Sequence, residues 1–255
     1  MKVSVLNLVP LRHGESFKDA MDAMVRLAKR VEDLGYTRYW IAEHHNMRSI
    51  ASSATQLLIQ HTLANTKKIR VGSGGVMLPN HSPYLIAEQY GTLETLYPNR
   101  VDLGLGRAPG TDVPTAMALR RTKDLKTDFE RDLAELSGYF KGSNYVQAYP
   151  AHGMYLPFYI LGSSTDSAYL AAKLGLPYSF AAHFAPTMME NAIAIYNRYF
   201  QPSAILDKPY VILGVNAILA DTDEEAKRLS TTMIQSFLNI VTSNQKGLMP
   251  PLQSE

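Results

Sequence analysis

Hydrophobic and polar positions follow two alternating spacings along the chain. Short runs rich in β-branched and aromatic residues alternate with longer stretches whose apolar residues recur every three or four positions, and this predicts strands alternating with helices. The first such stretch, from Phe17 to Leu34, ends at Gly35, a typical helix stop. The predicted strands are residues 3–8, 38–42, 69–78, 101–105, 158–161, 178–182 and 210–219. The predicted helices are residues 17–34, 52–64, 83–96, 114–138 (long enough to be two helices), 166–174, 187–200 and 221–241.

Seven strand-then-helix units predict an α/β fold with a parallel sheet. Parallel neighbours need crossover connections, which are right-handed in almost all known cases. A chain of 255 residues is close to the roughly 250 of a (β/α)8 TIM barrel, and no linker or repeat divides it. We therefore expect a single domain over residues 1–255, a (β/α)8 barrel whose last β/α unit is missing and whose C-terminal part is incomplete. A doubly wound open sheet is the alternative, although it usually needs fewer strands.

Composition narrows the class of protein. Hydrophobic residues make up 46% of the chain and charged residues 19%, which suits a folded domain. The formal net charge of +2 argues against a broad nucleic-acid-binding surface. The absence of cysteine excludes disulfides, thiolate metal sites and a cysteine nucleophile. With no signal-peptide pattern and no apolar run of about 18 residues, we expect a cytoplasmic protein that does not enter a membrane.

The catalytic groups of such a barrel lie on the loops that follow its strands. The loop after the second strand carries Glu43, His44 and His45, and a neutral histidine can act as a general base near pH 7. Adjacent residues of an extended chain point to opposite sides, so we expect only one of the two histidines to face the site and no metal ion to be shared between them. The alternative is that one histidine faces the pocket while the other hydrogen-bonds a helix start.

Two further loops suggest an anion site. Arg107 follows the fourth strand, and Gly162, Ser163 and Ser164 link the fifth strand to a helix. Helix N-terminal amides, hydroxyl groups and an arginine together can bind one phosphate group. Taken separately, Arg107 could form a surface salt bridge and the serines could simply cap the helix. The glycine-rich third strand, at residues 72–75, likewise fits either a bound ligand or close strand packing.

Several longer blocks carry a family resemblance. They are residues 39–45 (YWIAEHH), 71–79 (VGSGGVMLP) with His81 and Pro83, 87–89 (AEQ), 98–107 (PNRVDLGLGR), and 161–164 (LGSS) followed by 174–177 (LGLP). In these blocks, and in their order, the chain resembles the bacterial luciferase-like, flavin-dependent monooxygenase family. The resemblance extends from Val3 to about Val241. Members of that family are usually longer and supply an eighth strand, which is the basis for expecting an incomplete barrel here.

The resemblance implies a function and its participants. It implies an enzyme that uses reduced FMN and O2 to oxidise a small organic substrate, aldehyde-like or another apolar acceptor. A separate flavin reductase would supply the reduced FMN, with no metal, nucleic acid or membrane involved. It also implies a homodimer formed through the helices that follow strands two and three.

The resemblance also assigns site residues. His44 matches the family's strand-two histidine, a candidate base near the flavin peroxide, and Ala42 and Glu43 would line the same wall. Arg107 and the turn Gly162, Ser163 and Ser164 would hold the FMN phosphate. The backbone of Ser73, Gly74, Gly75 and Val76 would lie against the isoalloxazine ring. A cis peptide bond is expected behind the flavin at Ser73–Gly74, with Gly74–Gly75 as the second choice.

Three other functions stay open at this point. Shortened, non-catalytic FMN-binding relatives would fit the same residues without turnover, although an intact His44 favours an enzyme. A deazaflavin-dependent oxidoreductase of the same superfamily is the second alternative. A metal-dependent barrel hydrolase is the third, and it is disfavoured because the strand ends carry too few acidic residues for a hard-metal site.

Overall fold

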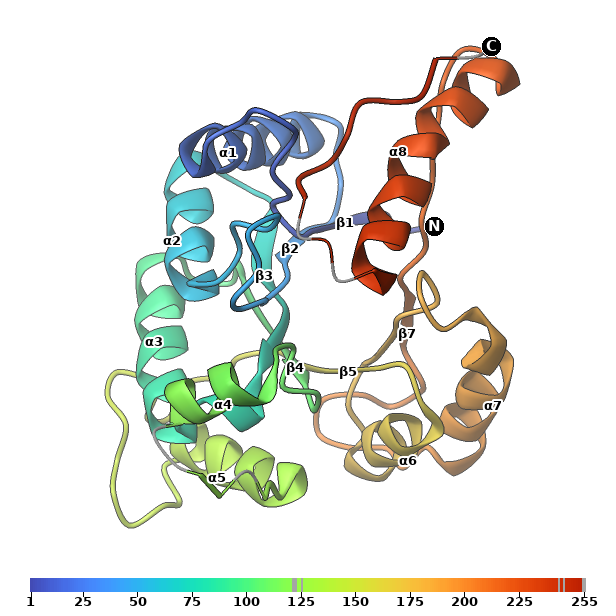
Figure 1. Cartoon of the computed structure of the whole chain (residues 1–255). Coiled ribbons are helices and arrows are strands. Elements are labelled where there is room, and N and C mark those ends of the chain that lie inside the picture. The colour runs from blue at the N-terminus through green and yellow to red at the C-terminus, as the bar shows by residue number, and fades with distance from the viewer. Residues whose placement is uncertain (121–122, 125, 243, 245, 254–255) are drawn as a thin grey trace.

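The computed structural model describes residues 1–120, 123–124, 126–242, 244 and 246–253. Its centre is a seven-stranded sheet in which neighbouring strands are parallel and follow chain order (Figure 1). The strands are β1 (Ser4–Asn7), β2 (Arg38–Ile41), β3 (Arg70–Met77), β4 (Val101–Gly106), β5 (Phe158–Gly162), β6 (Tyr178–Phe180) and β7 (Val211–Leu213). The helices are α1 (Phe17–Asp33), α2 (Thr55–Asn65), α3 (Pro83–Leu96), α4 (Val113–Arg120), α5 (Phe129–Lys141), α6 (Thr165–Leu174), α7 (Met189–Tyr199) and α8 (Asp223–Val241), with the short 3-10 helices η1 (Leu78–Asn80) and η2 (Pro186–Met188).

The sheet curls into a half-barrel with helices on its outside. In Figure 1, α1, α2, α3 and α5 lie on one flank, and α6 and α7 lie on the other. Each strand is followed by at least one α-helix before the next strand begins. The predicted α/β architecture is therefore confirmed, and it is consistent with a TIM-like barrel. Within the described residues, β1 pairs with β2 alone and β7 with β6 alone.

Two predicted elements differ from the observed ones by more than a few residues. The predicted helical stretch 114–138 is two helices, because the Asp128 side chain accepts a hydrogen bond from the Arg131 amide and so caps a new helix, α5. Residues 121, 122 and 125 of that stretch lie outside the described residues. The predicted strand 210–219 is reduced to the three-residue β7. Beyond Leu213, residues 215–219 are exposed and pair with no strand in the described part of the chain.

Strands β3 and β4 form the most tightly packed part of the sheet. All six residues of β4 are buried. A Cβ added at Gly72 would lie 2.1 Å from the backbone oxygen of Asp102, and one added at Gly104 would lie 2.2 Å from the backbone oxygen of Ser73. Both glycines are therefore needed for strand packing, and for Gly72 this is one of the two interpretations that the sequence leaves open for residues 72–75.

The amino ends of strands β2 to β5 meet at a buried charged network centred on Asp102. The Asp102 carboxylate accepts from Arg38 Nε at 3.1 Å and from Arg70 Nε at 2.7 Å. Trp40 Nε1 donates to the same carboxylate at 3.1 Å, and the Tyr159 hydroxyl donates at 3.4 Å. Asp102 itself is fully buried. The network joins four neighbouring strands, and no sequence prediction anticipates it.

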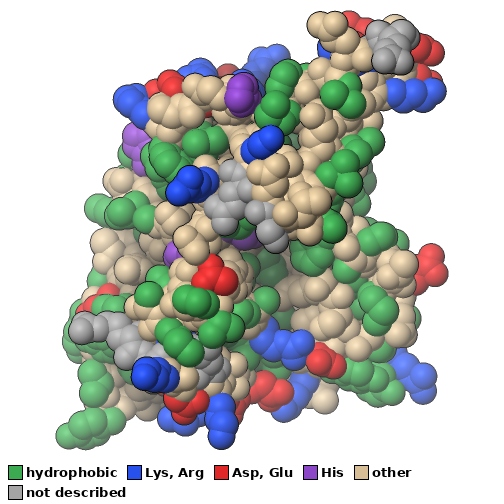
Figure 2. All heavy atoms as spheres, in the orientation of Figure 1, with side chains coloured by type: hydrophobic (Ala, Val, Ile, Leu, Met, Phe, Trp, Pro, Cys, Tyr) green, Lys and Arg blue, Asp and Glu red, His purple; other side chains and the backbone are tan. Residues whose placement is uncertain are grey.

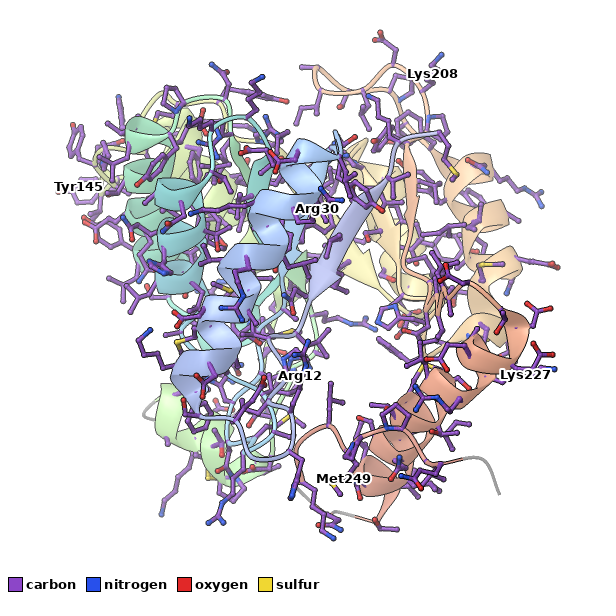
Figure 3. All side chains as sticks on the ribbon, turned by 90° about the horizontal axis from the view of Figure 1, so that it is seen from above. Arg12, Arg30, Tyr145, Lys208, Lys227 and Met249 are labelled. Atoms are coloured by element: carbon purple, nitrogen blue, oxygen red, sulfur yellow. The ribbon has the colours of Figure 1, made fainter. Side chains whose placement is uncertain are left out.

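The long segment between α5 and β5, residues 142–157, contains no helix or strand but is partly anchored in the core. Its residues Ala148 and Ala151 are fully buried. Gly91 of α3 makes room for it, because a Cβ there would lie 2.6 Å from the backbone nitrogen of Ala151. Tyr145 of the same segment is fully exposed and points outward (Figure 3). One part of this loop is therefore fixed against α3 while another part faces solvent.

Helix α8 stands apart from the other helices at the edge of the molecule (Figure 1). The Thr222 hydroxyl caps it by accepting from the Glu225 amide at 3.1 Å, and none of its residues is buried. The segment after α8 returns to the loop that follows β1, where the Leu248 amide donates to the Leu11 carbonyl at 2.7 Å. Of the tail 245–255, residues 245, 254 and 255 lie outside the described residues. No helix of the described chain is long and apolar enough to cross a membrane.

Candidate active site

The carboxyl ends of β2 and β3 carry a cluster of Glu43, His45 and His81. Glu43 and His45 lie in the loop after β2, and His81 follows η1 at the end of β3. Oε1 of Glu43 lies 2.9 Å from Nε2 of His45 and 2.8 Å from Nε2 of His81. The other carboxylate oxygen, Oε2, accepts from the Met77 amide at 3.2 Å. The buried Glu43 carboxylate therefore links the loop after β2 to the segment that follows β3 by hydrogen bonds.

The charge state of Glu43 follows from these contacts. Burial alone would raise the pKa of Glu43, but the hydrogen bonds from His45 and His81 outweigh it and lower the pKa to about 2. Glu43 is therefore ionised at neutral pH and acts as an acceptor. Each histidine is accordingly expected to carry its proton on Nε2, facing Glu43.

His44 lies in different surroundings from its neighbour His45. Its backbone amide donates to the Ser52 carbonyl at 3.1 Å. Its Nδ1 atom is buried and has no hydrogen-bond partner in the described part of the chain. Burial lowers the pKa of His44, and the nearby Glu43 carboxylate opposes this only in part, so the ring is neutral near pH 7. The prediction that the two adjacent histidines diverge agrees with this arrangement.

The third strand is irregular where the sequence predicts contact with a flavin ring. Its pairing with β4 shifts register between Ser73 and Val76. The Ser73 hydroxyl donates to the Gly104 carbonyl at 2.9 Å and accepts from the Gly104 amide at 3.1 Å. The cis peptide bond is Gly74–Gly75, so the first choice, Ser73–Gly74, is wrong and the second is confirmed. Ser73 stays in register with β4, and the irregularity therefore falls between the two glycines.

The remaining residues of this wall are largely enclosed. Ala42 and Val76 are buried. Gly74 faces the barrel interior, because a Cβ there would lie 2.6 Å from Leu6 Cδ1 and 3.1 Å from Trp40 Cβ. The side chains of this wall are thus small or buried, and Gly74 is the one residue of 73–76 that is partly exposed.

Of the predicted phosphate-binding residues, Arg107 borders an open cavity of about 810 Å³, and Gly162, Ser163 and Ser164 are not among the residues that line it. Arg107 lines this cavity together with the first turn of α6 and the start of α5. Gly162, Ser163 and Ser164 lie just before α6 and are half-buried. The Ser164 side chain makes no capping hydrogen bond. In Figure 2 the molecule is hollowed near the centre of the face shown, and Lys or Arg side chains lie beside the hollow.

Arg107 also has a partner that the sequence does not predict. Its guanidinium lies 3.3 Å from the Asp166 carboxylate, and both side chains are more than half exposed. The alternative of a surface salt bridge thus holds in this structure. Exposed pairs of this kind contribute little free energy, so Arg107 can exchange Asp166 for an anionic ligand at small cost.

Sequence reasoning names Glu43 as a candidate site residue but assigns no role to His81. His81 occurs in the block that carries the family resemblance, yet no role is inferred for it from spacing. Its nearness to Glu43 depends on the turn of η1, which brings a residue 38 positions away in sequence within hydrogen-bonding distance. A signal was present, since both residues follow neighbouring parallel strands, whose carboxyl ends meet at one edge.

The family of the chain follows from its sequence as a whole. The sequence profile of luciferase-like monooxygenases matches residues 1–250. The chain belongs to the luciferase-like monooxygenase family. The resemblance carried by the separate blocks is thereby confirmed, and it extends through α8.

Three relatives indicate how far the similarity reaches. The chain is 50% identical over 255 residues to the luciferase-like monooxygenase of Escherichia coli K12, covering 98% of this chain and 76% of the relative. It is 53% identical over 257 residues to the uncharacterized protein YddN of Bacillus subtilis 168, covering 99% and 76%. The N-acetyl-S-alkylcysteine monooxygenase of the same organism is 38% identical over 189 residues, which cover 71% of this chain and 57% of that enzyme.

Solved structures support the same fold. Apo-MsnO8 superposes with a TM-score of 0.92 at 35% identity, covering 98% of this chain and 75% of that one. The oxygenating constituent of 3,6-diketocamphane monooxygenase from Pseudomonas putida, solved with FMN, has a TM-score of 0.75 at 18% identity, covering 95% and 75%. A coenzyme F420-dependent reductase from Methanopyrus kandleri has a TM-score of 0.67 at 15% identity, with the same coverage. The last two show a shared fold alone.

Proposed function

We propose that this chain is a flavin-dependent monooxygenase that uses reduced FMN and O2 to oxidise a small organic substrate. The observation that carries the proposal is the Nδ1 atom of the neutral His44, at the end of a strand beside the irregular β3, which is buried and has no partner among the described residues. An unpaired polar atom in such a place costs free energy unless a ligand uses it. The proposal is supported by the family and by a relative named as an N-acetyl-S-alkylcysteine monooxygenase.

The residues present fit a flavin phosphate and ring. Arg107 and the free amides at the start of α6 offer a positive end for the phosphate. Gly74, the one partly exposed residue of 73–76, is where a flat ring would approach this strand. When bound, reduced FMN would supply the electrons with which O2 is activated. A separate flavin reductase would deliver it in that form.

His44 is the residue proposed to move a proton. Its ring is neutral near pH 7, and Nδ1, which has no hydrogen-bond partner in the described residues, offers a lone pair when the ring proton is on Nε2. A neutral imidazole placed at the reacting centre accepts or returns one proton, which contributes roughly a hundredfold or more to a rate.

The proposed substrate is a small apolar acceptor. An aldehyde is one candidate, and a thioether is the second because of the relative that acts on an S-alkylcysteine derivative. The loops that follow the strands set the shape of the substrate site in barrels, so the exact compound is a matter for the assay.

The protein is proposed to act as a homodimer through α2 and α3. Both helices present large apolar side chains to solvent, with Leu57 71% exposed and Leu85 52% exposed. Light scattering of the intact protein measures the mass directly. A Leu85→Glu variant that stays dimeric would exclude this surface as the interface.

The function is tested by oxygen consumption with photoreduced FMN. A panel of aldehydes, thioethers and sulfonates is supplied, and products formed under ¹⁸O2 are analysed for one labelled oxygen atom. His44→Ala serves as the matched control for uncatalysed flavin oxidation. Labelled product formed by the parent but not by this variant supports the proposal. FMN binding without any labelled product indicates a flavin carrier, and a preference for deazaflavin indicates an oxidoreductase of that type.

A further inference from the structure

The cluster of Glu43, His45 and His81 brings three metal-ligating groups together beside the proposed flavin site. Each residue offers one ligand atom, and the three atoms all lie within 4.8 Å of one another. We propose that these residues form a binding site for one divalent transition-metal ion such as Zn²⁺. The proposal does not depend on the proposed function, since it rests on these three side chains alone.

The type of ligand selects the class of ion. Two imidazole nitrogens and one carboxylate oxygen suit Zn²⁺, Co²⁺, Ni²⁺ or Cu²⁺. Mg²⁺ and Ca²⁺ prefer sets made of oxygen atoms, and this cluster offers a single carboxylate. Because three protein ligands leave one tetrahedral position open, a water molecule or another small ligand would complete the coordination.

The distances are close to those that a metal would need. Oε1 of Glu43 is 2.9 Å from Nε2 of His45 and 2.8 Å from Nε2 of His81. Ligand atoms around a tetrahedral Zn²⁺, with bonds of 2.0–2.1 Å, are about 3.3 Å apart. The carboxylate oxygen therefore has to withdraw by a fraction of an ångström from each ring, and the two ring nitrogens, which lie within 4.8 Å of each other, have to come to about the same 3.3 Å separation.

The surroundings hold the ligands and leave an entry path. The Met77 amide binds Oε2 of Glu43 and so keeps Oε1 directed at the two histidines. The Thr111 hydroxyl donates to the His45 carbonyl at 3.3 Å, which fixes that loop. The Glu43 side chain is buried, whereas those of His45 and His81 are 12% and 22% exposed. An ion can thus reach the cluster from the side of the histidines.

The protons balance without a further reactant. In the metal-free cluster each ring donates an Nε2 hydrogen to Glu43. On binding, each ring moves its proton from Nε2 to Nδ1, and the freed Nε2 lone pair coordinates the ion. No proton is released from neutral rings, and the bound ion and the carboxylate together carry a charge of about +1.

The sequence predicts that His44 and His45 share no metal ion, and the structure shows which other residue lies beside His45. The sequence argument excludes a metal shared by His44 and His45, and the two rings do lie in different surroundings. The partner of His45 is instead His81, from the next strand's loop. Two residues along an extended chain return to the same face, which is how Glu43 and His45 come to point together.

The test is a metal titration of the full chain after treatment with a chelator. Zn²⁺ binding is measured by calorimetry, and Co²⁺ binding by the visible absorption of a four-coordinate ion. One ion per chain is expected. His81→Ala and His45→Ala should each weaken Zn²⁺ binding by about a hundredfold or more, beyond the 10–100-fold typical of losing an outer-shell partner.

The matched control is His61→Ala, which removes an exposed histidine on α2 outside the cluster and should leave binding unchanged. Circular dichroism verifies that each variant is folded. If either alanine variant fails to fold, Glu43→Gln, which keeps the side-chain shape, should still weaken binding at least tenfold. A folded parent that binds no Zn²⁺, or a folded His81→Ala variant that binds as tightly as the parent, would overturn the proposal.

Discussion

Two fully buried carboxylates, Glu43 after β2 and Asp102 on β4, lie at opposite ends of the parallel sheet and have different hydrogen-bond partners. Asp102, at the amino ends, is held by the guanidinium groups of Arg38 and Arg70. Glu43, at the carboxyl ends, is held by the imidazole rings of His45 and His81. An arginine stays charged at every pH of interest, whereas a histidine can gain a proton, lose one or bind a metal. The Asp102 carboxylate therefore belongs to a network whose charges are fixed, whereas the partners of the Glu43 carboxylate can change their protonation or bind a metal.

This difference matches the separate roles of the two ends of a barrel, one structural and the other catalytic. The fixed charge network at the amino ends stabilises the sheet, whereas barrels carry their catalytic groups at the carboxyl ends of the strands. Changes at Asp102 should therefore lower stability and spare binding. Changes at His44, Arg107 or Glu43 should alter rate, affinity or acid stability and leave the fold in place.

Asp102→Asn is expected to have the largest effect, because it leaves two arginines without a counter-charge inside the sheet. Removing one partner of a buried ion pair costs roughly 3–5 kcal/mol, and urea unfolding measures this loss. The control is Asp22→Asn on α1, whose carboxylate pairs with the exposed Lys18. That surface pair should change the free energy of unfolding by less than about 0.5 kcal/mol. If both variants lower the free energy of unfolding equally, the Asp102 network does not have the stabilising role proposed for the amino ends of the strands.

His44→Ala is expected to slow substrate oxidation by about a hundredfold or more, the scale of a lost general base. FMN affinity should stay within a few-fold of the parent, and the urea midpoint should hardly move. Turnover is measured with photoreduced FMN, and affinity by flavin fluorescence. A variant that oxidises substrate at the parent's rate would leave His44 without the proposed role.

Arg107→Ala should weaken FMN binding by about tenfold to a hundredfold, because a charge-assisted hydrogen bond of roughly 1.5–3 kcal/mol is lost. Riboflavin, which has no phosphate, should bind almost as before. Asp166→Asn is the matched variant: it frees Arg107 from its salt bridge and should not weaken FMN binding. If Arg107→Ala weakens riboflavin as much as FMN, the phosphate lies elsewhere.

Acid stability gives the smallest and most specific difference. The pKa of Glu43 is about 2 in the folded protein against an ordinary value of 4.5, so the folded state binds fewer protons than the unfolded state between these values. The resulting stabilisation is complete above about pH 4.5 and is lost as the pH falls toward 2. The advantage of the parent over Glu43→Gln should therefore shrink by on the order of 2 kcal/mol between pH 6 and pH 3. Urea unfolding at both pH values measures it, and an advantage that does not change with pH would contradict this.

Much of the fold could be predicted because its signals are local. The apolar spacing of α1 and the run of buried residues in β4 depend on neighbours in sequence. The extent of β7 could not be predicted in this way. Residues 215–219 are apolar enough to continue a strand, but whether they do depends on a partner strand, and in the described chain they have none.

The site was only partly predictable because its contacts join separate strands. His44, Arg107 and the serines before α6 could be chosen by position at strand ends. The Arg107–Asp166 pair depends on side-chain reach between two loops, which spacing does not give. The Asp102 network had a weak signal, since Arg38 and Arg70 occupy the same first position of consecutive strands, but apolar patterning gives no weight to charged residues inside buried runs.

The loop at residues 142–157 contains one position that should tolerate an insertion or a new terminus and another that should not. Ala151 lies so close to Gly91 that no atom can be added between them. The Tyr145 side chain, by contrast, is fully exposed to solvent. Insertions and new termini are tolerated where the backbone is exposed and fail where it is buried. A fluorophore, an affinity tag or a fused domain placed at Tyr145 would therefore be carried outside the barrel, and the protein could be immobilised there with both ends of its strands undisturbed.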